Sequence, residues 1–280
     1  MPRRTIARPV EITGTGLHSG AQVSVRLEPA APGAGIAFER RDLSGTRPIP
    51  ARLDHVAATE RRTALRLGAH RADTVEHLLA AIYAQGIDDL VVALLGPEVP
   101  ILDGSFAPFV SLLDEAGHVD RPGATRRARL GALLRITEGD AHYIVSPHEV
   151  FGLEVTLEYL EPVIGRQTVE VVVTADSFRR DIQRARTYGF LGEIEPLRGR
   201  GLLAGAGAEC GILLDEGTVL NTTLRWPDEF ARHKAGDLIG DLALLEARLT
   251  LRIAAYRPSH RGNLACARAI AHAAHFTEEA

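Results

Sequence analysis

With 280 residues, 45% of them hydrophobic and 24% charged, and a formal net charge of −4, the sequence predicts a soluble globular protein long enough for two domains. The negative charge, without any run of basic residues, excludes an electrostatic argument for nucleic-acid binding, and no apolar run approaches the roughly 20 residues that span a bilayer. Because Cys210 and Cys266 form no CxxC pair and no signal peptide follows Arg3 and Arg4, we expect a reducing, cytoplasmic location.

The first half of the chain predicts several strands followed by a helix, a strand and a second helix. We predict a short hairpin over 5–13. After it, alternating polar and apolar residues predict half-buried strands at 22–28, 36–40, 48–56 and 63–67. Apolar residues at helical spacing predict a helix over 73–84, which Gly86 ends because glycine readily adopts the left-handed conformation. An apolar strand over 89–95 and a helix over 106–116 complete this half.

The second half follows a polar, basic segment with proline and glycine at 117–129, which we interpret as a linker. Beyond it we predict four strands, at 133–138, 142–146, 152–159 and 167–173, and then a helix over 175–185. An irregular insert rich in glycine and leucine follows over 189–211. The chain then continues with a strand over 212–214, a helix over 230–248, a strand over 249–256 and a terminal helix over 263–275. Both halves thus run from strands into helix, strand and helix. We therefore expect an α+β fold of two related two-layer α/β sandwich domains, 1–120 and 128–280, with the active site in the cleft between them.

The helix predicted over 230–248 carries the strongest candidate site. His233, Asp237 and Asp241 recur at i, i+4 and i+8, a spacing that stacks side chains along one face of a helix. An apolar stripe beside them would pack against a core. An imidazole and a carboxylate four residues apart suit a divalent cation such as zinc. The alternative is a solvated helix face that happens to carry a histidine and two aspartates.

A second constellation, Glu76-His77, stands near the start of the helix predicted over 73–84. Adjacent helical residues point about 100° apart, so both reach one site only if the end of the helix faces it. His77 would then add a second imidazole to the pair on the other helix, which is the composition of a catalytic zinc site, and Glu76 would act as the base. The alternative is a capping box, in which Asp73 or Thr74 caps the helix and Glu76 closes it.

Six sequence motifs together resemble one enzyme family. They occur in family order at 14–20, 74–78, 103–105, 184–190, 233–241 and 259–263, with the sequences GTGLHSG, TVEHL, DGS, RARTYGF, HKAGDLIGD and SHRGN. Over about residues 3–275 the chain is similar to zinc-dependent UDP-3-O-acyl-N-acetylglucosamine deacetylases, the enzymes of the committed step of lipid A synthesis. Each motif is weak alone, whereas the ordered set is specific. The resemblance implies a hydrolase that removes acetate from a UDP-linked, 3-O-acylated N-acetylglucosamine.

The resemblance also implies roles for individual residues. One zinc ion, with iron(II) as an alternative, would be bound by His77, His233 and Asp237. Glu76 would be the general base for the attack of water on the acetamide carbonyl. His260, expected in a loop, would be the imidazolium that stabilises the oxyanion and protonates the leaving amine, and Asp241 would orient it. The alternative for His260 is a solvated loop side chain.

The substrate contacts that the resemblance implies are spread over both halves. Thr187 would donate its hydroxyl to the oxyanion, and Lys234 would contact the polar body of the substrate. Further substrate contacts are expected from Tyr159, Phe190, Leu17, His18 and Leu202. The insert over 189–211 would form the passage for the acyl chain through Leu191, Ile194, Leu197, Leu202 and Leu203. The alternatives are a backbone-bonded threonine, a surface lysine and ordinary core leucines.

Three departures from the family pattern bear on substrate fit and leave the metal and proton-transfer residues intact. They are Glu161, where many members carry histidine, Glu193, where aspartate is common, and the glycine- and arginine-rich stretch 198–207. Two other functions stay open: the same metal site acting on a different N-acylated sugar, and a non-catalytic protein that senses UDP-sugars. We expect a monomer with a UDP-linked acylated amino sugar as ligand, no nucleic-acid partner and no transmembrane segment.

Overall fold

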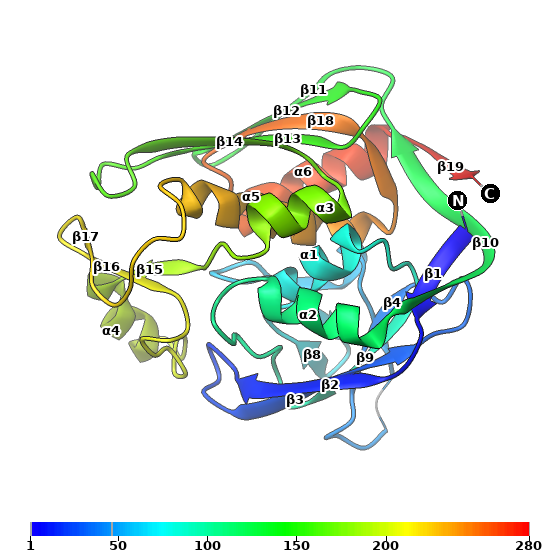
Figure 1. Ribbon diagram of the computed structural model, residues 1–280, viewed down its shortest axis with the longest axis horizontal. Helices are drawn as coiled ribbons and strands as arrows, with labels where there is room; N and C mark the ends of the chain where they lie inside the picture. Colours follow the sequence, from blue (N-terminus) through cyan, green and yellow to red (C-terminus); the bar gives the residue numbers. More distant parts are fainter. Residues whose placement is uncertain (1, 46, 280) are drawn as a thin grey trace.

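Helices lie between two β-sheets in this α+β molecule (Figure 1). The computed structural model describes residues 2–45 and 47–279. One outer layer is a five-stranded sheet and the other is an eight-stranded sheet, and the helices that cover them face each other at the centre. The expected α+β class is therefore confirmed. None of the described helices is long and apolar enough to cross a membrane.

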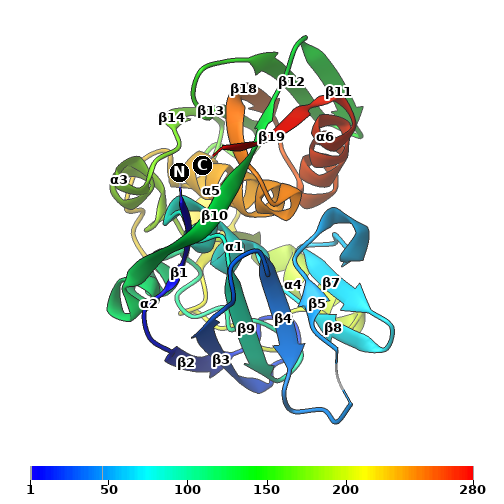
Figure 2. The ribbon, with the colours of Figure 1, turned by 90° about the vertical axis from the view of Figure 1, so that its right-hand side faces the viewer.

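The five-stranded sheet is formed by the first part of the chain. Its strands, in spatial order, are β2 (Val10–Thr15), β3 (Gln22–Pro29), β9 (Leu90–Leu95), β4 (Ile36–Arg40) and β5 (Ile49–Pro50). Neighbouring strands are antiparallel except β9 and β4, which run parallel. Its inner face is covered by α1 (Glu76–Ala84) and α2 (Ala107–Ala116). It is flanked by a small sheet of β6 (Val56–Ala58), β7 (Ala64–Leu67) and β8 (His70–Ala72), as Figure 2 shows.

The eight-stranded sheet comes mainly from the second part of the chain. Its strands are β1 (Pro2–Ile6), β10 (His118–Arg129), β11 (Leu134–Glu138), β12 (Ala141–Pro147), β13 (Gly152–Glu158), β14 (Arg166–Val172), β18 (Arg248–Tyr256) and β19 (His275–Glu279). Its inner face is covered by α5 (Glu229–Leu242), η3 (Ala243–Leu245) and α6 (His260–Ala273), beside α3 (Ala175–Ser177) and η2 (Phe178–Ile182). An outlying insert lobe consists of β15 (Tyr188–Phe190), α4 (Leu191–Gly199), β16 (Ile212–Asp215) and β17 (Thr218–Val219).

Helices α1 and α5 pack directly on each other and join the two layers. Leucines on both helices, such as Leu78 of α1 and Leu238 of α5, are fully buried. Gly240 permits the close approach, because a Cβ at this position would overlap the backbone oxygen of Glu76. This packing brings the start of α1 beside the middle of α5, where the candidate metal ligands lie.

Most predicted elements of the first half are confirmed, and Gly86 follows α1 with a φ of 75°. Two predictions are wrong. The hairpin over 5–13 does not form, because β1 pairs with β10 and β2 pairs with β3. The strand over 48–56 is interrupted, because β5 contains only Ile49–Pro50 and the helical turn η1 (Leu53–His55) follows it.

The segment 117–129 is mostly strand, so its interpretation as a linker is wrong. The first half of β10 pairs with β1, and the second half pairs with β19 and, in parallel, with β18. Pro122 and Gly123, which suggested a linker, lie where the register of the β1 pairing shifts, and a bulge tolerates both residues. Figure 2 shows β10 running from one layer to the other. The division into domains 1–120 and 128–280 stays a prediction, and its end residues 1 and 280 lie outside the described residues.

The strands predicted in the second half are present, whereas its helices differ in their bounds. The helix over 230–248 ends at Leu242, and that over 175–185 is a short α-turn followed by the π-helical η2. The insert is not wholly irregular, because α4 forms despite its internal Pro196. The terminal helix begins earlier, at His260, and is followed by β19, a strand that was not predicted from the sequence.

Two neighbouring arginines of β1 make ion pairs that differ in burial. Arg3 donates hydrogen bonds of 2.8 and 2.7 Å to Asp89, whose side chain is 0% exposed. Asp89 also accepts the backbone N–H of Gly35 at 2.8 Å. Arg4 pairs with Asp120 at 2.9 Å, but these side chains are 39% and 54% exposed. The buried pair ties β1 to the residue that precedes β9 in the other sheet.

Replacing the buried partner should therefore cost far more stability than replacing the exposed one. We expect Asp89→Ala to lower the free energy of unfolding by about 3 kcal/mol, because it removes the carboxylate that satisfies Arg3 and the Gly35 N–H. Asp120→Ala should change it by less than about 1 kcal/mol. Urea denaturation of the two variants checks this, and equal losses would contradict the role given to burial.

Candidate functional site

The predicted ligand face of α5 is buried. His233, Asp237 and Asp241 are 1%, 2% and 1% exposed, so the alternative of a solvated helix face is wrong. The helix packs against α1 on one flank and α6 on another. Because an unpaired buried charge is costly, each of these side chains must be satisfied by groups on the neighbouring elements or by a ligand.

The start of α1 brings Glu76 and His77 to this helix contact, where they are 3% and 4% exposed. Thr74 adopts a left-handed backbone conformation, with a φ of 56°, and its hydroxyl donates to Glu98 at 2.6 Å. Glu76 accepts the backbone N–H of Thr63 at 3.0 Å. Among the described residues no side chain caps α1, so the capping-box alternative is wrong.

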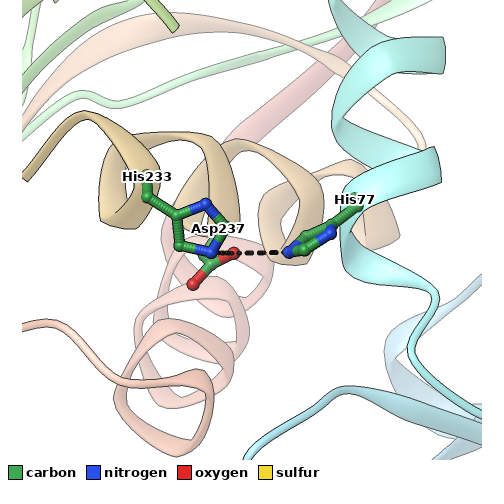
Figure 3. A group of neighbouring side chains, drawn as sticks. All are labelled: His77, His233 and Asp237. Carbon is green, nitrogen blue, oxygen red and sulfur yellow. Dashed lines mark ion pairs between the residues drawn. The ribbon is translucent and has the colours of Figure 1, made fainter. Parts of the chain in front are cut away.

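His77, His233 and Asp237 converge between α1 and α5 (Figure 3). One potential ligand atom from each lies within 4.8 Å of the others. The Oδ1 atom of Asp237 lies 3.5 Å from Nε2 of His77 and 3.4 Å from Nε2 of His233. Nδ1 of His233 lies 3.1 Å from the carbonyl oxygen of Ala185, which favours the tautomer that leaves the Nε2 lone pair available.

These atoms fit a divalent cation. Two imidazoles and one carboxylate match the three protein ligands of a catalytic zinc site. Oδ1 of Asp237 is buried and has no hydrogen-bond donor among the described residues, so a cation would satisfy it. Burial lowers the pKa of His233 to about 3, so the imidazole is neutral, as a metal ligand must be. Burial alone would raise the pKa of Asp237, but the neighbouring His233, Lys234 and His77 hold it well below its ordinary value.

His260 is the first residue of α6, so its expected place in a loop is wrong. The hydroxyl of Ser259 caps the helix by accepting the backbone N–H of Gly262 at 3.1 Å. Nδ1 of His260 lies 2.9 Å from Oδ2 of Asp241, and the residue is 8% exposed, so it is not solvated. Burial alone would lower the pKa of His260, but the charge and hydrogen bond of Asp241 raise it to about 9.

Glu76 and His260 form a pair of titratable groups whose environments suit opposite tasks. Oε1 of Glu76 lies 4.0 Å from Nε2 of His260. Burial raises the pKa of Glu76 and so makes the carboxylate a better proton acceptor near neutral pH. His260 is protonated at the same pH and can donate a proton from Nε2. A base and an acid set apart in this way are the arrangement needed for general acid–base catalysis.

A cavity of about 340 Å³ opens onto these groups. Its lining includes the three candidate ligands, Glu76 and His260, and also the predicted contacts Leu17, His18, Tyr159, Thr187, Phe190 and Lys234. Leu202, also predicted, is 7% exposed and lies outside this lining, in which Leu203 takes part instead. Asp241 lies outside it as well and contacts the far nitrogen of the His260 ring.

A second, mostly apolar cavity of about 210 Å³ adjoins the first, because the two share Leu17, Thr187, Tyr188, Gly189, Ile194 and Leu203. Its other walls include Ile212 and Leu213 of β16. Of the insert leucines predicted to form the acyl passage, Leu197 lines only the first cavity. Leu191 is 42% exposed and lines neither of the two.

Lys234 belongs to the site, so the alternative of a surface lysine is wrong. Its side chain is 20% exposed, and Nζ donates to Oδ2 of Asp237 at 2.9 Å. Nζ also lies 5.9 Å from the centre of the Tyr188 ring, and the Tyr188 hydroxyl lies 3.2 Å from that of Tyr159. The ring of Phe190 is 6.1 Å from that of Tyr159, so an aromatic wall stands beside the lysine.

Several supporting residues were not predicted from the sequence. Asn263 donates to Asp241 at 2.8 Å and, like Tyr188, lies inside one of the six motifs, which could have pointed to it. Arg61 pairs with Glu193 at 2.8 Å, so one departure from the family pattern has a partner at the cavity. Thr63 contacts both Glu76 and Asp241, but it lies in no motif and only the fold identifies it.

Comparisons with known proteins match this chain to one group of enzymes. The family model described as UDP-3-O-acyl N-acetylglycosamine deacetylase (LpxC) matches residues 3–272. The chain is 40% identical over 262 residues to the UDP-3-O-acyl-N-acetylglucosamine deacetylase of Myxococcus xanthus (strain DK1622), which covers 93% of this chain and 83% of the relative. Proteins of the same name from Anaeromyxobacter sp. (strain Fw109-5) and Brucella melitensis biotype 2 are 40% and 38% identical over 269 and 270 residues. These matches cover 96% of this chain and 88% and 94% of the two relatives.

The high pKa of His260 should depend on Asp241. In protein without added metal we expect the His260 imidazole to titrate with a pKa of about 9. In Asp241→Asn we expect this pKa to be lower by about one unit or more. Because the folded pKa exceeds the unfolded value of 6.5, the stability that this pair contributes is complete below about pH 6.5 and lost as the pH rises through about 9. NMR titration of the ring resonances, assigned with His260→Gln, measures the pKa of His260. Urea unfolding between about pH 6.5 and 9 measures how the free energy of unfolding depends on pH. A wild-type value at 6.5 would contradict the pairing.

Proposed function

We propose that this chain, which belongs to the UDP-3-O-acyl N-acetylglycosamine deacetylase family, hydrolyses the N-acetyl amide of UDP-3-O-(3-hydroxyacyl)-N-acetylglucosamine. The products are acetate and the free amine, and the reaction is the committed step of lipid A biosynthesis. The observation that carries this function is the convergence of two histidines and an aspartate with a buried base and a protonated acid in one cavity.

The enzyme is a metal-dependent hydrolase, and the metal that we propose is zinc, one ion per chain, with iron(II) as the alternative. His77, His233 and Asp237 would hold it, as their burial and the unsatisfied Oδ1 of Asp237 support. When bound, such a cation supplies Lewis-acid polarisation and positive charge at the reacting centre. Lys234 would keep the second oxygen of Asp237 engaged and so orient the carboxylate.

Glu76 would be the general base. One oxygen of its carboxylate is held by the backbone N–H of Thr63, which leaves the other to take the proton of the attacking water. Burial supports this role, because the raised pKa of Glu76 makes its conjugate base stronger. The proton on the water is therefore transferred to a group within the cavity rather than to solvent.

His260 would be the general acid. Asp241 holds the ring through Nδ1, so the proton on Nε2 is available to the leaving amine. The positive charge of the imidazolium also stabilises the oxyanion that forms when water adds to the amide carbonyl. Thr187, which lines the same cavity, would add its hydroxyl as a further donor to that oxyanion.

The substrate body would occupy the rest of the two cavities. We propose that Tyr159 and Phe190 contact the nucleotide and sugar, with Lys234 and His18 at the polar groups and Leu17 near the acyl chain. The mostly apolar second cavity would take that chain, because burial of methylene groups is favourable there. A cytoplasmic location and a monomeric state stay predictions, which cell fractionation and sedimentation would test.

The first experiment separates metal binding from proton transfer. Purified protein should contain about one zinc ion per chain, and His233→Ala should lose both the metal and acetate release, because one of three protein ligands is gone. Glu76→Gln should keep the metal and lower kcat by about 100-fold or more, because it removes only the base. Metal analysis and acetate release by the same preparations give the result. Full activity in His233→Ala would exclude this mechanism, and metal without turnover in the wild type would favour a sensor of UDP-sugars.

The second experiment tests the substrate through its acyl chain. Leu213 lines only the second cavity, so Leu213→Gln should raise KM for the 3-O-acylated substrate by about tenfold and leave turnover of the sugar without the chain unchanged. Leu160→Gln is the matched control, because that side chain is 99% exposed. If the wild type releases acetate equally well from both sugars, the enzyme acts on a different N-acylated sugar.

A further inference from the structure

Thr63 contacts both proton-transfer groups of the site from a position just before β7. It is 0% exposed. Its backbone N–H donates to Oε2 of Glu76 at 3.0 Å, and its hydroxyl donates to Oδ1 of Asp241 at 2.5 Å. The same hydroxyl oxygen lies 3.4 Å from Nδ1 of His260. A single residue therefore touches the base, the acid and the carboxylate that holds the acid.

We propose that Thr63 is a positioning residue that fixes Glu76 and His260 relative to each other for the deacetylation reaction. This inference rests on the proposed function. Thr63 does not line the cavity, so it acts through its hydrogen bonds and not by contact with the substrate.

The hydroxyl of Thr63 completes the hydrogen bonding of Asp241. Oδ2 of that carboxylate accepts from Nδ1 of His260 at 2.9 Å and from the amide of Asn263 at 2.8 Å. Oδ1 accepts from Thr63. Donors on both oxygens restrain rotation of the carboxylate, which in turn orients the His260 ring. Removing the hydroxyl would leave a buried carboxylate oxygen without this donor, which favours a changed geometry.

The backbone of Thr63 is anchored to the start of α1 on both sides. Its N–H donates to the Glu76 side chain, and its carbonyl oxygen accepts the N–H of Val75 at 3.2 Å. The hydroxyl bond to Asp241 on α5 thus ties this segment to the second helix. Oε1 of Glu76 and Nε2 of His260 are 4.0 Å apart across the reacting centre, and both ends of that gap depend on Thr63. Because misplacement of catalytic groups by about 1 Å can cost about 100-fold in rate, such a tie matters for turnover.

The test compares three variants in the full-length, metal-loaded enzyme with the acylated UDP-sugar as substrate. Thr63→Val removes the hydroxyl and keeps the shape, and Thr63→Ser restores the hydroxyl. Thr5→Val is the matched control, because Thr5 is also 0% exposed and its hydroxyl accepts a backbone hydrogen bond, from Ala30 at 3.1 Å, within another part of the fold. For each variant kcat, KM, bound metal and the urea midpoint are measured.

We expect Thr63→Val to lower kcat by about 10- to 100-fold, with KM and bound metal within about twofold of the wild type. Thr63→Ser should restore kcat to within about threefold, and Thr5→Val should keep the wild-type kcat even where its urea midpoint falls. The proposal is overturned if Thr63→Val keeps the wild-type kcat, if serine does not restore it, or if Thr5→Val loses as much.

A second measurement does not require turnover and separates this inference from the proposed function. In protein labelled with 15N-histidine, the Nδ1–H resonance of His260, assigned with His260→Gln, should move in Thr63→Val and stay in place in Thr63→Ser. If the wild type released no acetate, the proposed function would fail, and this resonance would still decide whether Thr63 positions the ring. An unmoved resonance in Thr63→Val overturns the positioning role.

Discussion

The close contact between α1 and α5 positions every group of the candidate site that lies on these two helices. The two helices belong to different layers, and Gly240 lets the backbone of one approach that of the other where any side chain would overlap Glu76. Gly236, one turn earlier, leaves room for the ring of Phe106 in the same way. This contact brings Nε2 of His77 on α1 to 3.5 Å from Oδ1 of Asp237 on α5 and so assembles the candidate ligand set. A structural requirement for small residues therefore lies inside the same motif that carries the candidate ligands His233 and Asp237.

Burial and hydrogen-bond partners give chemically similar side chains different protonation states and different free lone pairs. His233 and His260 are both imidazoles, but burial keeps the first neutral, whereas Asp241 keeps the second protonated. Asp237 and Asp241 lie one helical turn apart, yet one has an oxygen without a donor and the other is satisfied on both oxygens. The first arrangement suits a cation and the second suits orientation of an acid. Residue type alone does not assign these roles, because each depends on the few atoms within hydrogen-bond reach.

Ion pairs connect the insert lobe to the segment 59–63 beside the site. Arg61 of the segment pairs with Glu193 of the lobe at 2.8 Å. Arg200 of the lobe pairs with Glu60 of the segment at 2.6 Å, so each side supplies one cation and one carboxylate. The departures from the family pattern at 193 and within 198–207 thus have partners. Exposed pairs of this kind are worth about 1 kcal/mol or less each, so they guide the lobe rather than hold it rigidly.

Features that depend on local geometry could be predicted from the order of the residues. The spacing of His233, Asp237 and Asp241 specified a shared helix face, alternation located most strands, and the ordered motifs identified the family. Which surfaces meet could be seen only in the folded molecule. The 117–129 segment has the composition of a linker and becomes a strand because β1, β18 and β19 offer it hydrogen-bond partners from distant parts of the chain. Thr63 likewise acquires its contacts 178 residues away, at Asp241. Periodicity reports which face of an element is buried, but it carries no information about the partner that buries it.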